Sequence, residues 1–166
     1  MTPADIKGTI VAHRNDRMGA RIISMLNAIR ISRDYDIPWT CGWTTGGRTH
    51  EECRDPTFIF DDDFVARRFF DNEVLVDVYD ELIDLTTVQG VGDKGREKFI
   101  NRAKNGKAFL SGAAMGVTVL PWEDEAKVAV DLPLCMDGFE YSAPVAAMIT
   151  EIDDMFAGSK LTAFHI

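Results

Sequence analysis

The sequence has few cysteines, no long apolar run and no surplus of positive charge. Its 166 residues include three cysteines, an odd and sparse set that suits free thiols better than a disulfide framework. No stretch of about 18 apolar residues is present, and the N-terminus lacks the basic-then-apolar layout of a secretory signal. A net charge of -9 argues against a broad nucleic-acid-binding surface, which needs an excess of Lys and Arg. We therefore expect a soluble cytoplasmic protein with no transmembrane segment and no nucleic-acid partner.

The first third of the chain reads as strand, polar turn, helix and strand. Residues 8–13 are a short, β-branched apolar run, which predicts a buried strand. Apolar side chains then recur at helical spacing, and Arg21, Asn27 and Arg30 lie off that apolar face. Residues 37–43 follow a proline-marked stop and predict a second strand. This order is a βαβ unit.

The remainder continues the alternation of strands and helices. Further strands are predicted over residues 57–60, 73–79, 107–110, 127–130 and 161–166, and helices over 64–70, 93–104 and 143–157. The fold class that follows is α/β, with a Rossmann-like parallel sheet and flanking helices.

The turn between the first strand and the first helix carries the strongest functional signal. It holds Arg14, Arg17, Gly19 and Arg21 at the place where a βαβ fold presents backbone amides and a positive helix end. Arginine pairs with phosphate oxygens in fork geometry, and glycine lets a ligand approach the backbone. The alternative interpretation is a capped helix whose glycine is needed for helix–strand packing.

An Asp-rich turn offers a second, metal-dependent hypothesis. Asp61 and Asp63 follow the apolar run 57–60, and an Asp-x-Asp after a strand holds a divalent cation in one class of glycosyltransferase. The alternative is that these aspartates cap the helix that follows.

Two further patterns match a motif only in part. Residues 90–95 spell G-x-G-x-x-G ahead of a helix, but a dinucleotide fingerprint also needs a clear preceding strand and a downstream acid. His50 and Cys53 with Cys41 could be grouped as zinc ligands, although no C-x-x-C pair accompanies them. We expect a loop in the first case and no zinc site in the second.

Two segments resemble the fucosyltransferase-like glycosyltransferases, which include the nodulation, core α1,6- and protein O-fucosyltransferases. Residues 14–30 resemble the family's opening turn and helix, with Gly19 at its second glycine and Arg21 at the last position of the turn. Residues 161–166 resemble the strand that leads into the family's H-x-R-R-G-D type motif, with His165 at its histidine.

The resemblance implies the N-terminal half of a GT-B glycosyltransferase. Residues 1–160 would form the acceptor-side domain, and 161–166 would begin a truncated donor-binding domain. The enzyme would move a sugar, with fucose from GDP-fucose as the candidate, from a nucleoside diphosphate sugar to a glycan or other hydroxyl, without a cofactor or metal. Its implied substrate-binding residues in this sequence are Arg14, Arg17, Gly19, Arg21 and His165. Arginines beyond Ile166 would stabilise the leaving diphosphate, so these 166 residues alone are predicted to be inactive.

Two alternatives stay open at this point. One is a complete, non-enzymatic α/β binding or assembly module that meets a protein partner through its acidic surface and the loop 111–116. The other is the metal-dependent glycosyltransferase that uses Asp61 and Asp63.

Overall fold

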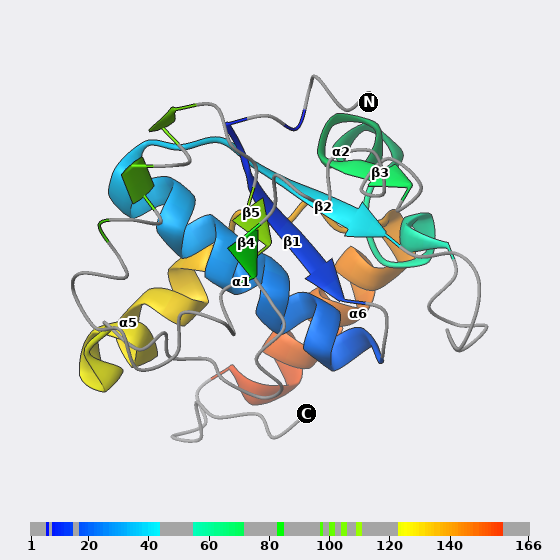
Figure 1. Cartoon of the computed structure of the whole chain (residues 1–166). Helices are drawn as coiled ribbons and strands as arrows, with labels where there is room; N and C mark the ends of the chain where they lie inside the picture. Colours follow the sequence, from blue (N-terminus) through cyan, green and yellow to red (C-terminus); the bar gives the residue numbers. More distant parts are fainter. Residues whose placement is uncertain are drawn as a thin grey trace.

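The structure is a computed structural model that describes residues 6, 8–14, 17–43, 55–71, 83–84, 97, 100–101, 104–105, 109–110 and 123–157 (Figure 1). Its elements in chain order are β1 (Ile10–Arg14), α1 (Met18–Tyr35), β2 (Trp39–Trp43), the 3-10 turn η2 (Pro56–Phe58), α2 (Asp62–Arg68), β3 (Phe69–Asp71), β4 (Ile83–Asp84), β5 (Phe109–Leu110), α5 (Glu125–Met136) and α6 (Ala143–Phe156).

The strands form one sheet in the order β3-β2-β1-β5-β4, and every pairing between described strands is parallel. The three strands β3-β2-β1 make its longer part, and β5 and β4 add two residues each. Ile10 lies opposite Trp39 on one side and Phe109 on the other. The predicted Rossmann-like parallel sheet with flanking helices is therefore confirmed.

The two central strands are buried on both faces, which explains why their sequences are apolar without alternation. Ile10, Val11 and Ala12 of β1 have no exposed surface, and all five residues of β2 are buried. Helix α1 runs beside β1 and packs against β1 and β2 (Figure 1). The predicted strands at 8–13 and 37–43 are thus confirmed to within two residues.

Helix α1 is buried more completely than its sequence predicts. Arg21, Asn27 and Arg30, which lie off the apolar face, are exposed by only 2%, 3% and 0%. The helix begins at Met18, so Gly19 lies in its first turn and not in the loop before it. A helix packed between a sheet and a second helix has little solvent-facing surface, so polar positions on its far side become interior ones.

The predicted strand at residues 57–60 is wrong. Asp55 accepts hydrogen bonds from the amide (2.9 Å) and the hydroxyl (2.7 Å) of Thr57, and Pro56 occupies the first position of η2. This local capping favours a helical turn over an extended strand. Only Phe60 keeps an extended contact, an isolated antiparallel bridge to Tyr141. The helix predicted over 64–70 is confirmed as α2, which ends at Arg68 where β3 begins.

The predicted strand at residues 127–130 is also wrong, because this segment lies in α5. A short apolar run fits a buried strand or a helix equally well by periodicity. The carboxylate of Asp124 accepts the Lys127 amide at 3.0 Å, as a helix N-cap does, and α5 packs on α1. Capping and packing together decide for helix.

The last predicted helix is confirmed as α6. Of the helix predicted over 93–104, four residues are described as helical: Glu97, Ile100, Asn101 and Lys104. The strand predicted at 107–110 is present as β5. The segments 73–79, 90–95, 111–116 and 161–166 lie outside the described residues.

Candidate functional site

The sheet topology places a candidate site at the carboxyl end of β1. From β1 the chain passes through α1 and returns at β2, on one side of β1. On the other side lies β5, which the chain reaches only after crossing to β4 at the far edge. In open parallel sheets, ligands bind outside the carboxyl ends of the strands at such a reversal of strand order. Helix α1 begins there, with three residues between the end of β1 and its first residue.

Within the described residues, the start of α1 carries positive charge and has no side-chain cap. Arg17 occupies the N-cap position, and within the described part of the chain its side chain makes no capping hydrogen bond. The amides of Ala20 and Arg21 bond to the Arg17 carbonyl at 3.1 and 3.3 Å, which leaves Met18 and Gly19 as the amides without an acceptor inside the helix. No acidic residue lies in the first turn of this 18-residue helix, so no side chain of that turn offsets the positive end of the helix.

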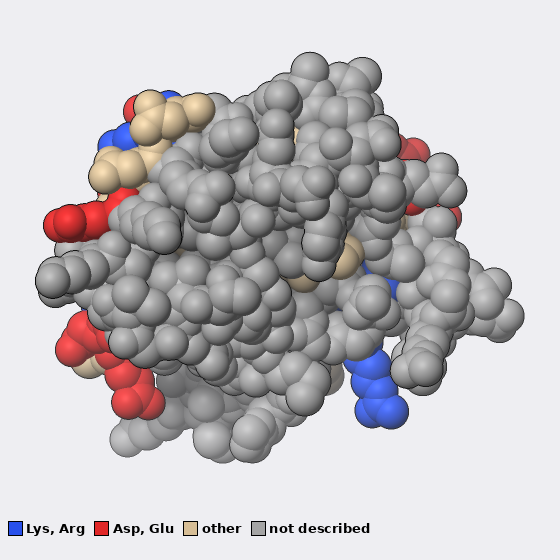
Figure 2. Space-filling view, viewed as in Figure 1, with Lys and Arg blue, Asp and Glu red and all other residues tan. Residues whose placement is uncertain are grey.

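Arg17 adds a full charge to this helix end. Its side chain is exposed, and Figure 2 shows Lys and Arg side chains in the region of the view where Figure 1 places the start of α1. Asp and Glu side chains are visible on both the left and the right of that view, so the charges are not separated by side. The exposed guanidinium of Arg17 and the positive end of the helix would both attract an anion here.

Gly19 leaves open space in front of the helix start. It is exposed, and a β-carbon built on it would have no atom of the described residues within 4 Å. Its φ angle is not positive, so neither packing nor backbone conformation requires a glycine. The alternative interpretation, a glycine needed for helix–strand packing, therefore finds no support in its surroundings.

Arg21 lies beneath the helix start and inside the fold. Its guanidinium carbon lies 4.4 Å from the centroid of the Trp43 ring, a cation–π distance that joins the first turns of α1 to the end of β2. Only 2% of its surface is exposed. Arg21 therefore belongs to the interior of the fold beneath the helix start, whereas Arg17 and Gly19 are exposed there.

The other predicted substrate-binding residues are described only in part. Arg14 is the last residue of β1, but its side chain lies outside the described part, as does the whole of His165. The structure therefore brings together Arg17 and Gly19 at the helix start, with Arg21 below them.

The aspartates of the metal hypothesis have another role in the structure. The carboxylate of Asp61 accepts the amides of Asp63 (2.9 Å) and Phe64 (3.3 Å), so it is the N-cap of α2. Asp62 and Asp63 form the acidic first turn that a helix dipole favours. Among the described residues, no group of three or more His, Cys, Asp or Glu could hold a metal ion.

Replacing Asp61 tests this capping role. We expect Asp61→Ala to lower the free energy of unfolding by about 1 kcal/mol and Asp61→Asn to leave it nearly unchanged, because Asn caps as well as Asp. Urea unfolding followed by circular dichroism measures both. Manganese binding that is lost in Asp61→Asn would contradict the capping role and favour the metal site.

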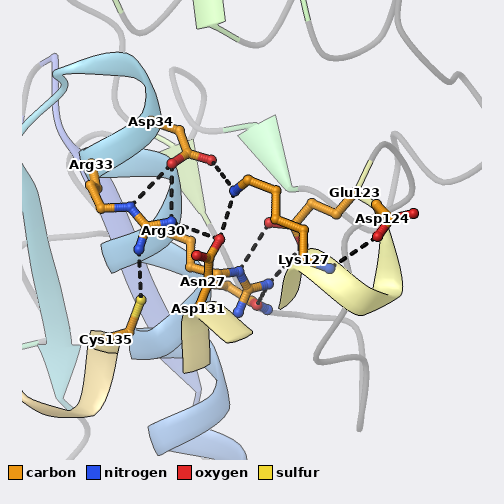
Figure 3. A network of polar contacts seen from close by, with 9 residues as sticks. All are labelled: Asn27, Arg30, Arg33, Asp34, Glu123, Asp124, Lys127, Asp131 and Cys135. Atoms are coloured by element: carbon orange, nitrogen blue, oxygen red, sulfur yellow. Dashed lines mark hydrogen bonds and ion pairs between the residues drawn. The ribbon is translucent and has the colours of Figure 1, made fainter. Parts of the chain in front are cut away.

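A charged constellation between α1 and α5 was not predicted (Figure 3). Arg30 donates from Nε to Glu123 Oε1 (3.0 Å) and from Nη2 to Glu123 Oε2 (2.7 Å), a two-pronged ion pair. Its Nη2 also donates to Asn27 Oδ1 at 2.7 Å. Since 93 residues separate Arg30 from Glu123, no local sequence signal could have joined them.

The outer part of this network is held by two shared carboxylates. Asp131 accepts from Lys127 Nζ (2.6 Å) and Arg33 Nη2 (2.8 Å), and Asp34 contacts the same two cations. The hydrogen bond from Lys127, aided by Arg33, lowers the pKa of the Asp131 carboxyl. Each cation already bonds to carboxylates, so the network fastens α5 to α1 and is not a ligand site.

Two cysteines are described, and both are buried thiols. Burial raises the pKa of the Cys41 and Cys135 thiols, and this disfavours the thiolate needed for zinc binding or nucleophilic chemistry. The other two possible zinc ligands considered from the sequence, His50 and Cys53, lie outside the described residues.

Comparison with known proteins adds no relative: no family model, curated protein or solved structure matches this chain. Among the described helices, none combines the length and apolar character that crossing a membrane needs.

Proposed function

We propose that this α/β domain is the acceptor-side part of a glycosyltransferase that moves a sugar, with fucose as the candidate, from a nucleoside diphosphate sugar to a hydroxyl acceptor. The observation that carries the proposal is the positive start of α1 at the carboxyl end of β1, where Arg17 is exposed at the N-cap position and its side chain makes no capping hydrogen bond. The family resemblance of residues 14–30 supports it independently.

Transfer of a sugar from a nucleoside diphosphate requires positive charge beside the diphosphate. A nucleoside diphosphate leaving group gains negative charge as its bond to the sugar breaks, and fixed positive groups stabilise that charge. Helix amides and arginines supply it without rearranging during the reaction. Arg14 and Arg17 would hold one side of the cleft, with Arg21 behind them in the interior, and His165 would belong to the donor side.

Titration of the isotopically labelled chain with GDP tests the proposal by NMR. We expect weak, millimolar binding that shifts the amide signals of Met18, Gly19 and Ala20, because one side of the cleft contacts the diphosphate. GMP should bind less well, since it carries one phosphate fewer. Arg17→Gln should weaken GDP binding by about fivefold, on the order of 1 kcal/mol for one exposed charge.

A matched control and two contrary outcomes complete this experiment. Lys104 is an exposed cation that precedes β5, at the amino edge of the sheet, so Lys104→Gln should leave GDP binding unchanged. Unshifted amides at the start of α1 would contradict the anion site. Micromolar GDP binding would show a complete donor site within this chain and contradict the split cleft.

Gly19→Ala probes the open space separately. Alanine should raise helix stability slightly, by at most about 1 kcal/mol, while its methyl group occupies the space in front of the helix. We expect normal or higher thermal stability together with weaker GDP binding. Unchanged GDP affinity would show that the ligand does not approach this residue.

A further inference from the structure

Among the described residues, helix α6 contacts the body of the fold at its beginning. The amide of Ser142 donates to the Ile59 carbonyl at 2.8 Å, and its hydroxyl donates to the Phe58 carbonyl at 3.1 Å. Tyr141, just before it, stacks on Phe60 with ring centroids 6.3 Å apart. None of the 14 residues of α6, all of them described, is buried.

An apolar stripe nevertheless runs the whole length of α6. The stripe is defined by residues at helical spacing, namely Val145, Met148, Ile149, Ile152, Met155 and Phe156. Met148, Met155 and Phe156 expose 53%, 71% and 44% of their surface, whereas Val145, Ile149 and Ile152 are half-buried, so the stripe is exposed mainly along its methionine edge. A helix with such a stripe normally buries it, and an exposed stripe with methionines is typical of a surface that binds another helix.

Carboxylates line both edges of this stripe. Glu151 lies one turn from Met148 and from Met155, along one edge. Asp153 lies one turn from Ile149 and from Phe156, along the other edge. The helix contains no Lys or Arg, so both edges are negative.

We infer that the stripe of α6 binds an amphipathic helix of a partner protein, one whose apolar face is flanked by Lys or Arg. Charge decides among the possible occupants. A second copy would bring the edge carboxylates of one α6 against those of the other, in a chain of net charge -9. An anionic membrane surface would be repelled by the same carboxylates. A helix with an apolar face flanked by Lys or Arg would bury the apolar stripe and would also pair with the carboxylates along both of its edges.

Three designed peptides test the inference by fluorescence anisotropy. The first is an amphipathic helix with a leucine face and lysine flanks, the second has glutamates in place of the lysines, and the third keeps the lysines but has serines in place of the leucines. We expect the first to bind and the other two to bind at least tenfold more weakly, because each lacks one half of the complementarity.

Variants locate the binding on α6. Met148→Gln and Met155→Gln should each weaken binding of the lysine-flanked peptide by roughly tenfold, since each removes one apolar contact and no charge. Ala147→Gln, an exposed position off the stripe, should have no effect. A double Glu151→Lys/Asp153→Lys variant should reverse the preference toward the glutamate-flanked peptide. Circular dichroism checks that each variant stays folded.

Several results would overturn the inference. Equal binding of the first and third peptides, or binding that both methionine variants leave unchanged, would mean general attraction to an acidic protein. Absence of binding would exclude a basic helix as the occupant. A dimer in sedimentation that Met148→Gln dissociates would identify a second copy as the occupant, and binding to anionic vesicles would identify a membrane.

Discussion

Replacing Phe60 with alanine is expected to lower the free energy of unfolding by about 3–5 kcal/mol. Phe60 has no exposed surface and is the centre of an aromatic cluster. Five rings surround it at centroid distances of 5.4 to 6.3 Å, those of Trp43, Phe64, Phe69, Phe139 and Tyr141. They come from separate parts of the chain, so removing the central ring leaves a cavity where these parts meet.

The chain offers a closely matched control for this experiment. Phe58 is the same residue type two positions earlier, but 71% of its surface is exposed. Phe58→Ala should change the free energy of unfolding by less than about 0.5 kcal/mol. Urea unfolding followed by tryptophan fluorescence measures both variants. Equal losses would contradict the assignment of Phe60 to the core and Phe58 to the surface.

Glu123→Ala is expected to be nearly as costly, with a loss of about 3 kcal/mol. The Arg30 guanidinium is fully buried, and the Glu123 carboxylate meets it with both oxygens. Without that carboxylate, the buried guanidinium loses the acceptor that both its Nε and its Nη2 contact. Removing one partner of a buried ion pair therefore lowers the free energy of unfolding by more than the intact pair adds to it.

A double variant separates the two costs. Arg30→Met/Glu123→Leu removes both charges and keeps apolar volume between α1 and α5, so most of the lost stability should return. Glu140→Ala serves as the surface comparison, because its partner Arg67 is exposed, and it should cost far less. If the double variant were as unstable as Glu123→Ala, the loss would come from packing and not from the isolated charge.

The sequence is a good guide to this fold where one signal acts alone. The β-branched run at 8–13 and the apolar stripe of residues 145–156 have one clear period each, and both elements are present. The strand predictions for residues 57–60 and 127–130 are wrong because a short apolar run does not show whether its spacing is that of a strand or of a helix. At both places, an aspartate cap upstream and packing against a distant segment decide for helical structure.

The sequence predicts where in the fold the candidate site lies, but it does not predict which of its arginines is buried. Arginines after an apolar strand point to the start of the next helix, and Arg17 lies there. The residues next to Arg21 in the sequence do not show that its side chain points into the fold. The ring that it contacts belongs to Trp43 in β2, which follows α1 in the chain. The ion pair between α1 and α5 is hidden for the same reason, since it depends on long-range packing.

The open surroundings of Gly19 have an evolutionary consequence. Folding alone would accept alanine at this position, and a helix gains stability from that change. Folding alone would thus tolerate glycine or alanine here, whereas a ligand that needs the space would restrict the position to glycine. A glycine kept at position 19 across related sequences would mark a ligand that needs the space, and drift to alanine would mark its loss.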